Sequence, residues 1–152
     1  MATRITPERP DTADARALIA ELEEQLAPLY PSESRHGYAV EKLIAQKVAF
    51  FLIRHDGQPV GCGGVQLFGT EYGELKRMYV RPQLRGLGMA KALLTHLAEH
   101  VRARGVGLLR LETGIHQHAA IGLYEREGFR PIPPFGEYKD DPLSRFYEKR
   151  IL

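Results

Sequence analysis

The chain has 152 residues, of which 43% are hydrophobic and 26% charged, so it can bury the core of one compact domain and is unlike a disordered or fibrous chain. The longest apolar run, residues 48–53, is far shorter than the roughly 20 residues of a membrane span. The net charge of +2 lacks the basic excess of a nucleic-acid-binding protein. We therefore expect one domain, residues 1–152, that binds neither membrane nor nucleic acid.

The single cysteine, Cys62, excludes a disulfide framework and a cysteine-built metal cluster. Residues 1–16 contain no apolar segment typical of a secretory signal. His96 and His100 are four residues apart, but the acid between them is wrongly placed for the zinc-binding H-E-x-x-H pattern. We expect a cytoplasmic protein without a metal site.

The first half of the chain favours a strand, two helices and three further strands. Residues 3–5 favour a short strand, and the apolar spacing from Ala15 to Leu29 predicts a helix that Pro28 and Pro31 end. A second helix is predicted over residues 38–46. Strands are predicted over residues 48–53, 60–68 and 74–80, the first two joined by a hairpin turn at residues 56–57.

The second half alternates helices and strands. The apolar positions predict a helix over residues 85–104, ended by Gly105, then a strand over 108–113 and a helix over 118–127. A proline-rich loop, residues 131–142, precedes a last strand at 145–151. This order predicts an α/β protein with a mixed sheet and helices on its faces.

Five basic residues and no acidic residue lie between positions 76 and 91, which leaves 16 basic and 19 acidic residues elsewhere. The five are Lys76, Arg77, Arg81, Arg85 and Lys91. Such a run can be a solvated face, but it surrounds a short motif, residues 80–90, that joins a strand end, a glycine turn and a helix start. Unpaired amides at a helix start bind phosphate, and Gly86 and Gly88 allow the backbone to approach it. We expect a phosphate-binding turn here.

Two common phosphate-binding motifs do not fit this turn. The dinucleotide motif G-x-G-x-x-G requires a small residue where Lys91 stands, and no G-x-x-x-x-G-K-[ST] loop is present. A dinucleotide-dependent oxidoreductase and a nucleoside triphosphatase are therefore disfavoured.

Two segments resemble the GNAT superfamily of acyl-CoA-dependent N-acyltransferases. Residues 83–90 resemble its pyrophosphate-binding signature Q/R-x-x-G-x-G/A, starting at Gln83 or at Arg85. Residues 120–129 resemble its A-x-x-L-Y-x-x-x-G-F segment. The resemblance implies a mostly antiparallel sheet with helices on both faces, covers residues 74–129 clearly, and leaves open the homodimer common in the family.

The resemblance implies that acetyl-CoA is the co-substrate and implies where it binds. Backbone amides of Arg85, Gly86, Leu87, Gly88, Met89 and Ala90 would hold the pyrophosphate. Met78, Tyr79 and Val80 would pair with the pantetheine arm, and the Val80 amide would meet the thioester carbonyl. At Gln117 the family often has Asn, so this sequence keeps an amide in place of the family's residue.

Acyl transfer to an amine needs a base for the ammonium proton and an acid for the leaving thiolate. Tyr124 stands where GNAT enzymes commonly have the general acid, and Glu74 and Glu112 are candidate bases on the predicted strands. The alternatives are a core tyrosine and, for Glu112, an ordinary glutamate paired with Arg110.

The acceptor site is expected in two segments of mixed charge, residues 29–38 and 135–141. Glu33, Arg35 and His36 in the first would suit a primary amine of a small polar or amino-acid-like molecule, as would Tyr138 and Asp140 in the second. A protein lysine or N-terminus stays open as the acceptor. A noncatalytic acyl-CoA-binding module is a further alternative.

Overall fold

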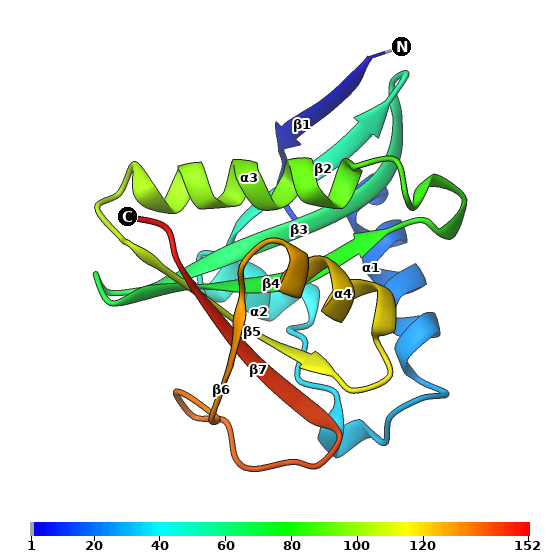
Figure 1. The fold of residues 1–152 in the computed structure, drawn as a ribbon. Helices are drawn as coiled ribbons and strands as arrows, with labels where there is room; N and C mark the ends of the chain where they lie inside the picture. The colour runs from blue at the N-terminus through cyan, green and yellow to red at the C-terminus, as the bar shows by residue number, and fades with distance from the viewer. Residues whose placement is uncertain (1) are drawn as a thin grey trace.

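A seven-stranded sheet forms the centre of the molecule, shown in Figure 1. The computed structural model describes residues 2–152, and the strands within them are β1 (Thr3–Pro7), β2 (Ala49–His55), β3 (Gln58–Phe68), β4 (Tyr72–Val80), β5 (Leu108–Gly114), β6 (Arg130–Ile132) and β7 (Ser144–Arg150). Their order in the sheet is β1-β2-β3-β4-β5-β7-β6. All neighbours pair antiparallel except β4 and β5, so the predicted mixed and mostly antiparallel sheet is confirmed.

Helices cover both faces of this sheet. The helices α1 (Ala13–Leu26) and α2 (Val40–Ala45) pack with Phe50 and Leu52 of β2. The helices α3 (Met89–Arg102) and α4 (His118–Arg126) pack on the opposite face, where Phe51 and Ile53 point. This alternation follows from the two-residue period of a strand. We call the two sides the α1/α2 face and the α3/α4 face.

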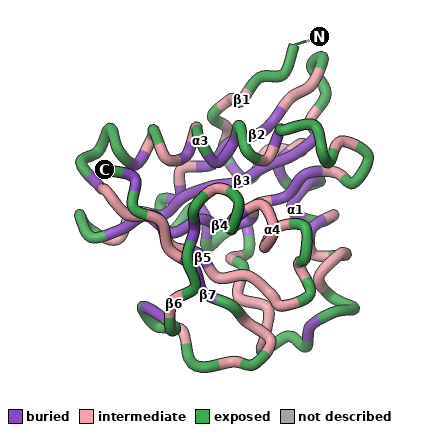
Figure 2. The backbone as a smooth tube through the Cα atoms, viewed as in Figure 1, coloured by how far each residue is buried: buried purple, intermediate pink, exposed green. Residues whose placement is uncertain are grey.

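Buried residues concentrate in the central strands β2, β3 and β4, as Figure 2 shows. In a smaller cluster, Phe135 of the connection between β6 and β7, residues 133–143, packs with Tyr72 and Phe146. None of the helices within residues 2–152 combines the length and apolar character that crossing a membrane would require.

Three expectations about element boundaries are wrong. The first helix ends at Leu26, and Leu29 lies beyond it with 42% of its surface exposed. The helix predicted from residue 85 begins only at Met89, because Gly86 and Gly88 have φ of 80° and 81°, outside the right-handed helical region. The proline-rich segment begins with the short strand β6, and Pro131 is tolerated there because β6 is an edge strand.

The strands β4 and β5 separate toward their C-terminal ends. Their parallel pairing consists of Gly73 with Leu109 and Glu74 with Arg110. Beyond these pairs β4 contains a bulge against β3, at which Arg77 adopts φ of 55°. The C-terminal half of β4 therefore has a free edge beside the end of β5.

Candidate active site

A cleft of about 980 Å³ lies along this free edge of β4 and reaches α4 and the start of α3. The predicted cofactor-binding residues that line it are Met78, Tyr79, Val80, Arg85, Gly86, Gly88, Met89, Ala90 and Gln117. Leu87 is not among the lining residues, and its side chain points outward with 65% of its surface exposed. Gln25 near the end of α1 and Leu29 just beyond this helix also line the cleft.

The start of α3 provides one end of the cleft with unpaired amides. Gly88 caps this helix and, having no side chain, offers no capping hydrogen bond to the first turn. The first four N–H groups of a helix have no partner within it, and the helix dipole adds partial positive charge there. Open space lies where a Cβ of Gly86 or Gly88 would be, so the positive φ, rather than lack of room, requires glycine. This turn fits a phosphate group.

Val80 directs its backbone groups toward the cleft. The Arg81 amide donates to the Val60 carbonyl at 2.8 Å, so the alternation of an antiparallel ladder turns the Val80 N–H and C=O away from β3. The Arg85 Nε donates to the Val80 carbonyl at 2.9 Å, which agrees with this direction. The predicted donor to a thioester carbonyl therefore faces the cleft.

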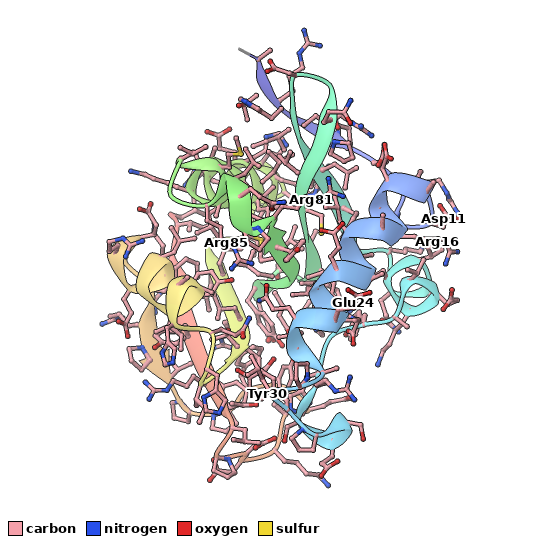
Figure 3. The ribbon with its side chains drawn as sticks, turned by 90° about the vertical axis from the view of Figure 1, so that its right-hand side faces the viewer. Asp11, Arg16, Glu24, Tyr30, Arg81 and Arg85 are labelled. Atoms are coloured by element: carbon pink, nitrogen blue, oxygen red, sulfur yellow. The ribbon has the colours of Figure 1, made fainter. Side chains whose placement is uncertain are left out.

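The five residues of the basic run do not gather at the phosphate-binding turn. Lys76 pairs with Glu74, Arg77 with Glu23, and Arg81 with Glu21 at 2.7 Å. Among the five residues, Arg85 and Lys91 line the cleft. Figure 3 shows Arg81 and Arg85 between α4 and α1. The other three cations are held by carboxylates because the bulge and the strand alternation turn them toward the α1/α2 face.

Tyr124 lies in the cleft wall on the α3/α4 face. Tyr124 is 5% exposed, and its ring contacts the Phe129 ring edge-on, with 5.6 Å between the ring centroids. Burial and the nearby charge of Glu112 raise the pKa of the phenol, which keeps it protonated. Tyr124 therefore belongs both to the core and to the wall of the cleft. Because its hydroxyl stays protonated, it can donate a hydrogen bond or a proton.

Glu74 is held inside the protein. It is 3% exposed, and its Oε2 accepts hydrogen bonds from Lys76 Nζ at 2.8 Å and from Tyr138 Oη at 2.5 Å. The Lys76 ammonium lies 3.9 Å from the centre of the Tyr38 ring and 3.3 Å from Tyr138 Oη. Glu74 thus belongs to a buried, closed cluster on the α1/α2 face.

Glu112 lies on the same face and is less enclosed. Its Oε2 accepts a hydrogen bond from Ser144 Oγ at 2.8 Å. Arg110, the partner expected for it, instead pairs with Glu148 at 3.1 Å. Within residues 2–152 no basic group lies within ion-pair distance of Glu112. Burial raises the pKa of this carboxyl, and the Ser144 hydrogen bond opposes that shift.

The predicted acceptor residues do not gather at one point. Glu33 is exposed, and Arg35 lies 3.6 Å from Glu23. The His36 ring lies 3.6 Å from Asp141 and contacts Tyr138 edge-on. These contacts join the connection between α1 and α2, residues 27–39, to residues 133–143.

Sequence reasoning included Tyr30 and Tyr38 in the predicted acceptor segment, residues 29–38, but gave them no role, and it left Tyr138 without a partner. Tyr30, labelled in Figure 3 beyond the end of α1, accepts a hydrogen bond from the His116 amide at 2.9 Å. Its hydroxyl occupies the place where a side chain of Gly114 would be. Glycine at the end of a predicted strand was the available signal, because glycine there often marks close approach of another group.

The fold and this cleft define an acyl-CoA-dependent N-acyltransferase, and comparison with known proteins agrees. The family model described as "Acetyltransferase (GNAT) family" matches residues 15–129. The chain therefore belongs to the GNAT acetyltransferase family and is an acyl-CoA-dependent acetyltransferase. This membership disfavours the noncatalytic alternative.

Individual relatives cover nearly the whole chain. A protein named IAA acetyltransferase from Azospirillum brasilense is 43% identical over 88% of both chains. A putative acyl-CoA N-acyltransferase structure from Klebsiella pneumoniae has 40% identity and a TM-score of 0.85, covering 99% of this chain and 98% of that one. The fold also matches the Thermoplasma acidophilum PaiA N-acetyltransferase in complex with coenzyme A, at 20% identity, a TM-score of 0.76 and 99% coverage of both.

Proposed function

We propose that this acetyltransferase transfers the acetyl group of acetyl-CoA directly to the primary amine of a small polar or amino-acid-like molecule. The observation that carries the proposal is the opening between β4 and β5. The cleft with its phosphate-binding turn and Tyr124 runs along this opening between α1 and α4, and Glu112, which does not line the cleft, lies on the α1/α2 face of β5. Co-substrate and acceptor would approach the opening from opposite faces of the sheet.

The residues along the cleft match the successive parts of acetyl-CoA. The amides at the start of α3 would hold its pyrophosphate, and the edge of β4 would pair with its extended arm. Acetyl-CoA, when bound, supplies an acyl group activated as a thioester. The outward-facing Val80 amide would stabilise negative charge that develops on the acyl oxygen, which is worth about 3 kcal/mol for one such donor.

Glu112 is the base that we propose for the acceptor. An ammonium must lose a proton before its nitrogen can attack, and a carboxylate without a cationic partner attracts that ammonium. A raised pKa makes the ionised Glu112 a stronger base than an ordinary glutamate. Glu74 is less suitable because Lys76 and Tyr138 already occupy its Oε2.

Tyr124 is the donor that we propose for the leaving thiolate, since burial keeps its phenol protonated. A covalent enzyme intermediate on cysteine is disfavoured by the position of Cys62. This thiol is fully buried, and burial raises its pKa to about 12. Direct transfer therefore needs no nucleophile other than the acceptor.

The contacts over the α1/α2 face favour a small acceptor over a peptide. Residues 27–39 and 133–143 meet there through His36, Asp141 and Tyr138. Tyr38 and Tyr138 also both contact the Lys76 ammonium. A peptide lying across this face would have to separate these segments, whereas a small amine would not.

A thermal-shift titration tests the co-substrate site. Acetyl-CoA and CoA at about 100 times their Kd should stabilise the wild type by about 2.7 kcal/mol, which raises Tm by several degrees. An Arg85→Glu, Gly88→Glu double variant should lose this shift, whereas the control Arg4→Glu, on the exposed strand β1, should keep it. Stabilisation by NAD but not by CoA would overturn the proposal.

Release of CoA thiol then tests the acceptor class. The panel contains L-amino acids, ethanolamine, a peptide with one lysine, and IAA, the compound in the name of the Azospirillum relative. We expect the wild type to release CoA thiol with a small amine. The Tyr124→Phe variant should release it much more slowly with the same amine. Turnover confined to the peptide would reject the small acceptor and retain the acetyltransferase.

A further inference from the structure

The charges at the opening between β4 and β5 form an alternating pattern. Glu74 and Lys76 lie on the α1/α2 face of β4, and Arg110 and Glu112 lie on the same face of β5. Since Glu74 is in register with Arg110, the next positions on that face place Lys76 beside Glu112 where the strands part. By this placement Lys76 is the lysine that β4 brings next to Glu112.

Lys76 nevertheless does not pair with Glu112. Its ammonium is turned back along its own strand to Glu74 at 2.8 Å and is further held by Tyr138 and by the Tyr38 ring. Its side chain is 4% exposed, so solvent cannot replace a lost partner. Burial lowers the pKa of Lys76 and the neighbouring Glu74 charge opposes this shift, so a carboxylate neighbour is what keeps the ammonium charged.

We propose that Glu74 is a positioning residue: it holds Lys76 on β4 and thereby keeps Glu112 free of a cationic partner and available to the ammonium of the acceptor. Without the Glu74 charge, the Lys76 ammonium turns to Glu112 and forms an ion pair with its carboxylate. The proposal rests on the proposed function in that Glu112 is the base. It assigns Glu74 an effect through Lys76 and no contact with the reacting atoms.

Other groups around Glu112 do not replace Lys76 in this role. The titratable groups that face it from the neighbouring elements are Tyr30, His36, Glu74, Lys76, Tyr124 and Tyr138. The three tyrosines are neutral, and His36 is already 3.6 Å from Asp141. Lys76 is therefore the ammonium of this set, and its carboxylate partner is Glu74.

The test measures the titration of the Glu112 carboxyl by carbon-13 NMR in the full chain, with Glu112→Gln used to assign the signal. Glu74→Gln should lower the pKa of Glu112, because the repulsion by the Glu74 charge is lost and Lys76 then stabilises the Glu112 charge. Glu74→Gln combined with Lys76→Met should cancel this lowering. An unchanged Glu112 titration in Glu74→Gln, or the same lowering with and without Lys76, would overturn the proposal.

A second measurement does not require Glu74→Gln to fold. The nitrogen-15 signal of the Lys76 ammonium should be the same in the wild type and in Glu112→Gln, because Glu74 is its partner in both. A large change in that signal on removal of the Glu112 charge would show that Lys76 already pairs with Glu112 and would reject the proposal.

Kinetics separate this proposal from the proposed function. With the amine found in the screen, Glu74→Gln should move the acidic limb of the kcat/KM profile to lower pH and reduce kcat on the order of tenfold or more. The double variant should recover part of that loss, which a merely structural role of Glu74 would not produce. Full activity of Glu112→Gln would reject Glu112 as the base while leaving the NMR result for Glu74 and Lys76 intact.

Discussion

The cleft side and the acceptor side of the opening differ in how far apart their residues lie in the sequence. The phosphate-binding turn comes from one short segment, residues 85–91, and its chemistry resides in backbone amides and two glycines. The acceptor side is assembled from distant segments. Tyr138 reaches Glu74 across 64 positions, and Tyr30 reaches the His116 amide across 86.

This difference separates two kinds of interaction. The turn depends on local backbone conformation, so a short motif contains nearly all the information that it needs. The acceptor side depends on buried charges whose effect is set by their partners, and buried charges cost free energy unless they are paired. The co-substrate is thus bound by a local feature, and the acceptor by a tertiary one.

The largest expected effect comes from removing the base on the acceptor side. Glu112→Gln should lower kcat on the order of 10³-fold, within the usual range for a positioned general base. Its affinity for acetyl-CoA should stay within about twofold, because Glu112 is not among the residues that line the cleft. Steady-state kinetics and a titration with acetyl-CoA measure the two separately.

The matched control is Glu148→Gln, on the same face and paired with Arg110. It should retain activity.

In the wild type the acidic limb of kcat/KM should lie above the ordinary glutamate range, because burial raises the pKa of Glu112 and its charged form is the active one. This limb should disappear in Glu112→Gln. If Glu112→Gln instead lost affinity for acetyl-CoA as strongly as it loses kcat, Glu112 would belong to the co-substrate site.

The same difference explains what could be predicted from the sequence. The sheet, the helices and the glycine turn follow from periodicity and from local motifs, and the structure agrees with them apart from a few boundaries. The partners of Arg77 and Arg81 could not be predicted, because the carboxylates that neutralise them lie on α1, more than 50 positions away. A linear run of charge does not specify which face of a bulged strand each charge occupies.

A smaller effect is expected where the two sides meet, at Gly114. A Cβ there would lie 2.1 Å from Tyr30 Oη and 2.2 Å from its Cζ, so Gly114→Ala must displace a buried ring. Such overpacking typically costs about 1–3 kcal/mol. Urea denaturation should show this loss, and acetyl-CoA binding should weaken because His116 and Gln117 in the cleft wall move with the loop.

A double-variant cycle tests the cause of this loss. Gly114→Ala combined with Tyr30→Ala should be more stable than the sum of the two single losses predicts, by on the order of 1 kcal/mol, because the clash is absent. Strict additivity would mean that the ring does not occupy this place. The cycle also measures how strongly the end of α1 is joined to β5.

The smallest effects are expected within the turn itself, where neighbouring residues should behave differently. Gly88→Ala places a side chain at φ of 81°, which costs about 1–2 kcal/mol and should weaken acetyl-CoA binding about 5- to 30-fold if binding requires this conformation. Leu87→Ala should change affinity by less than about twofold, because the 65% exposed side chain lies outside the cleft lining. Calorimetric titration of both variants with acetyl-CoA measures the contrast. A strong loss in Leu87→Ala would mean that side chains, and not the backbone alone, hold the co-substrate, and the turn would then be less local than its motif indicates.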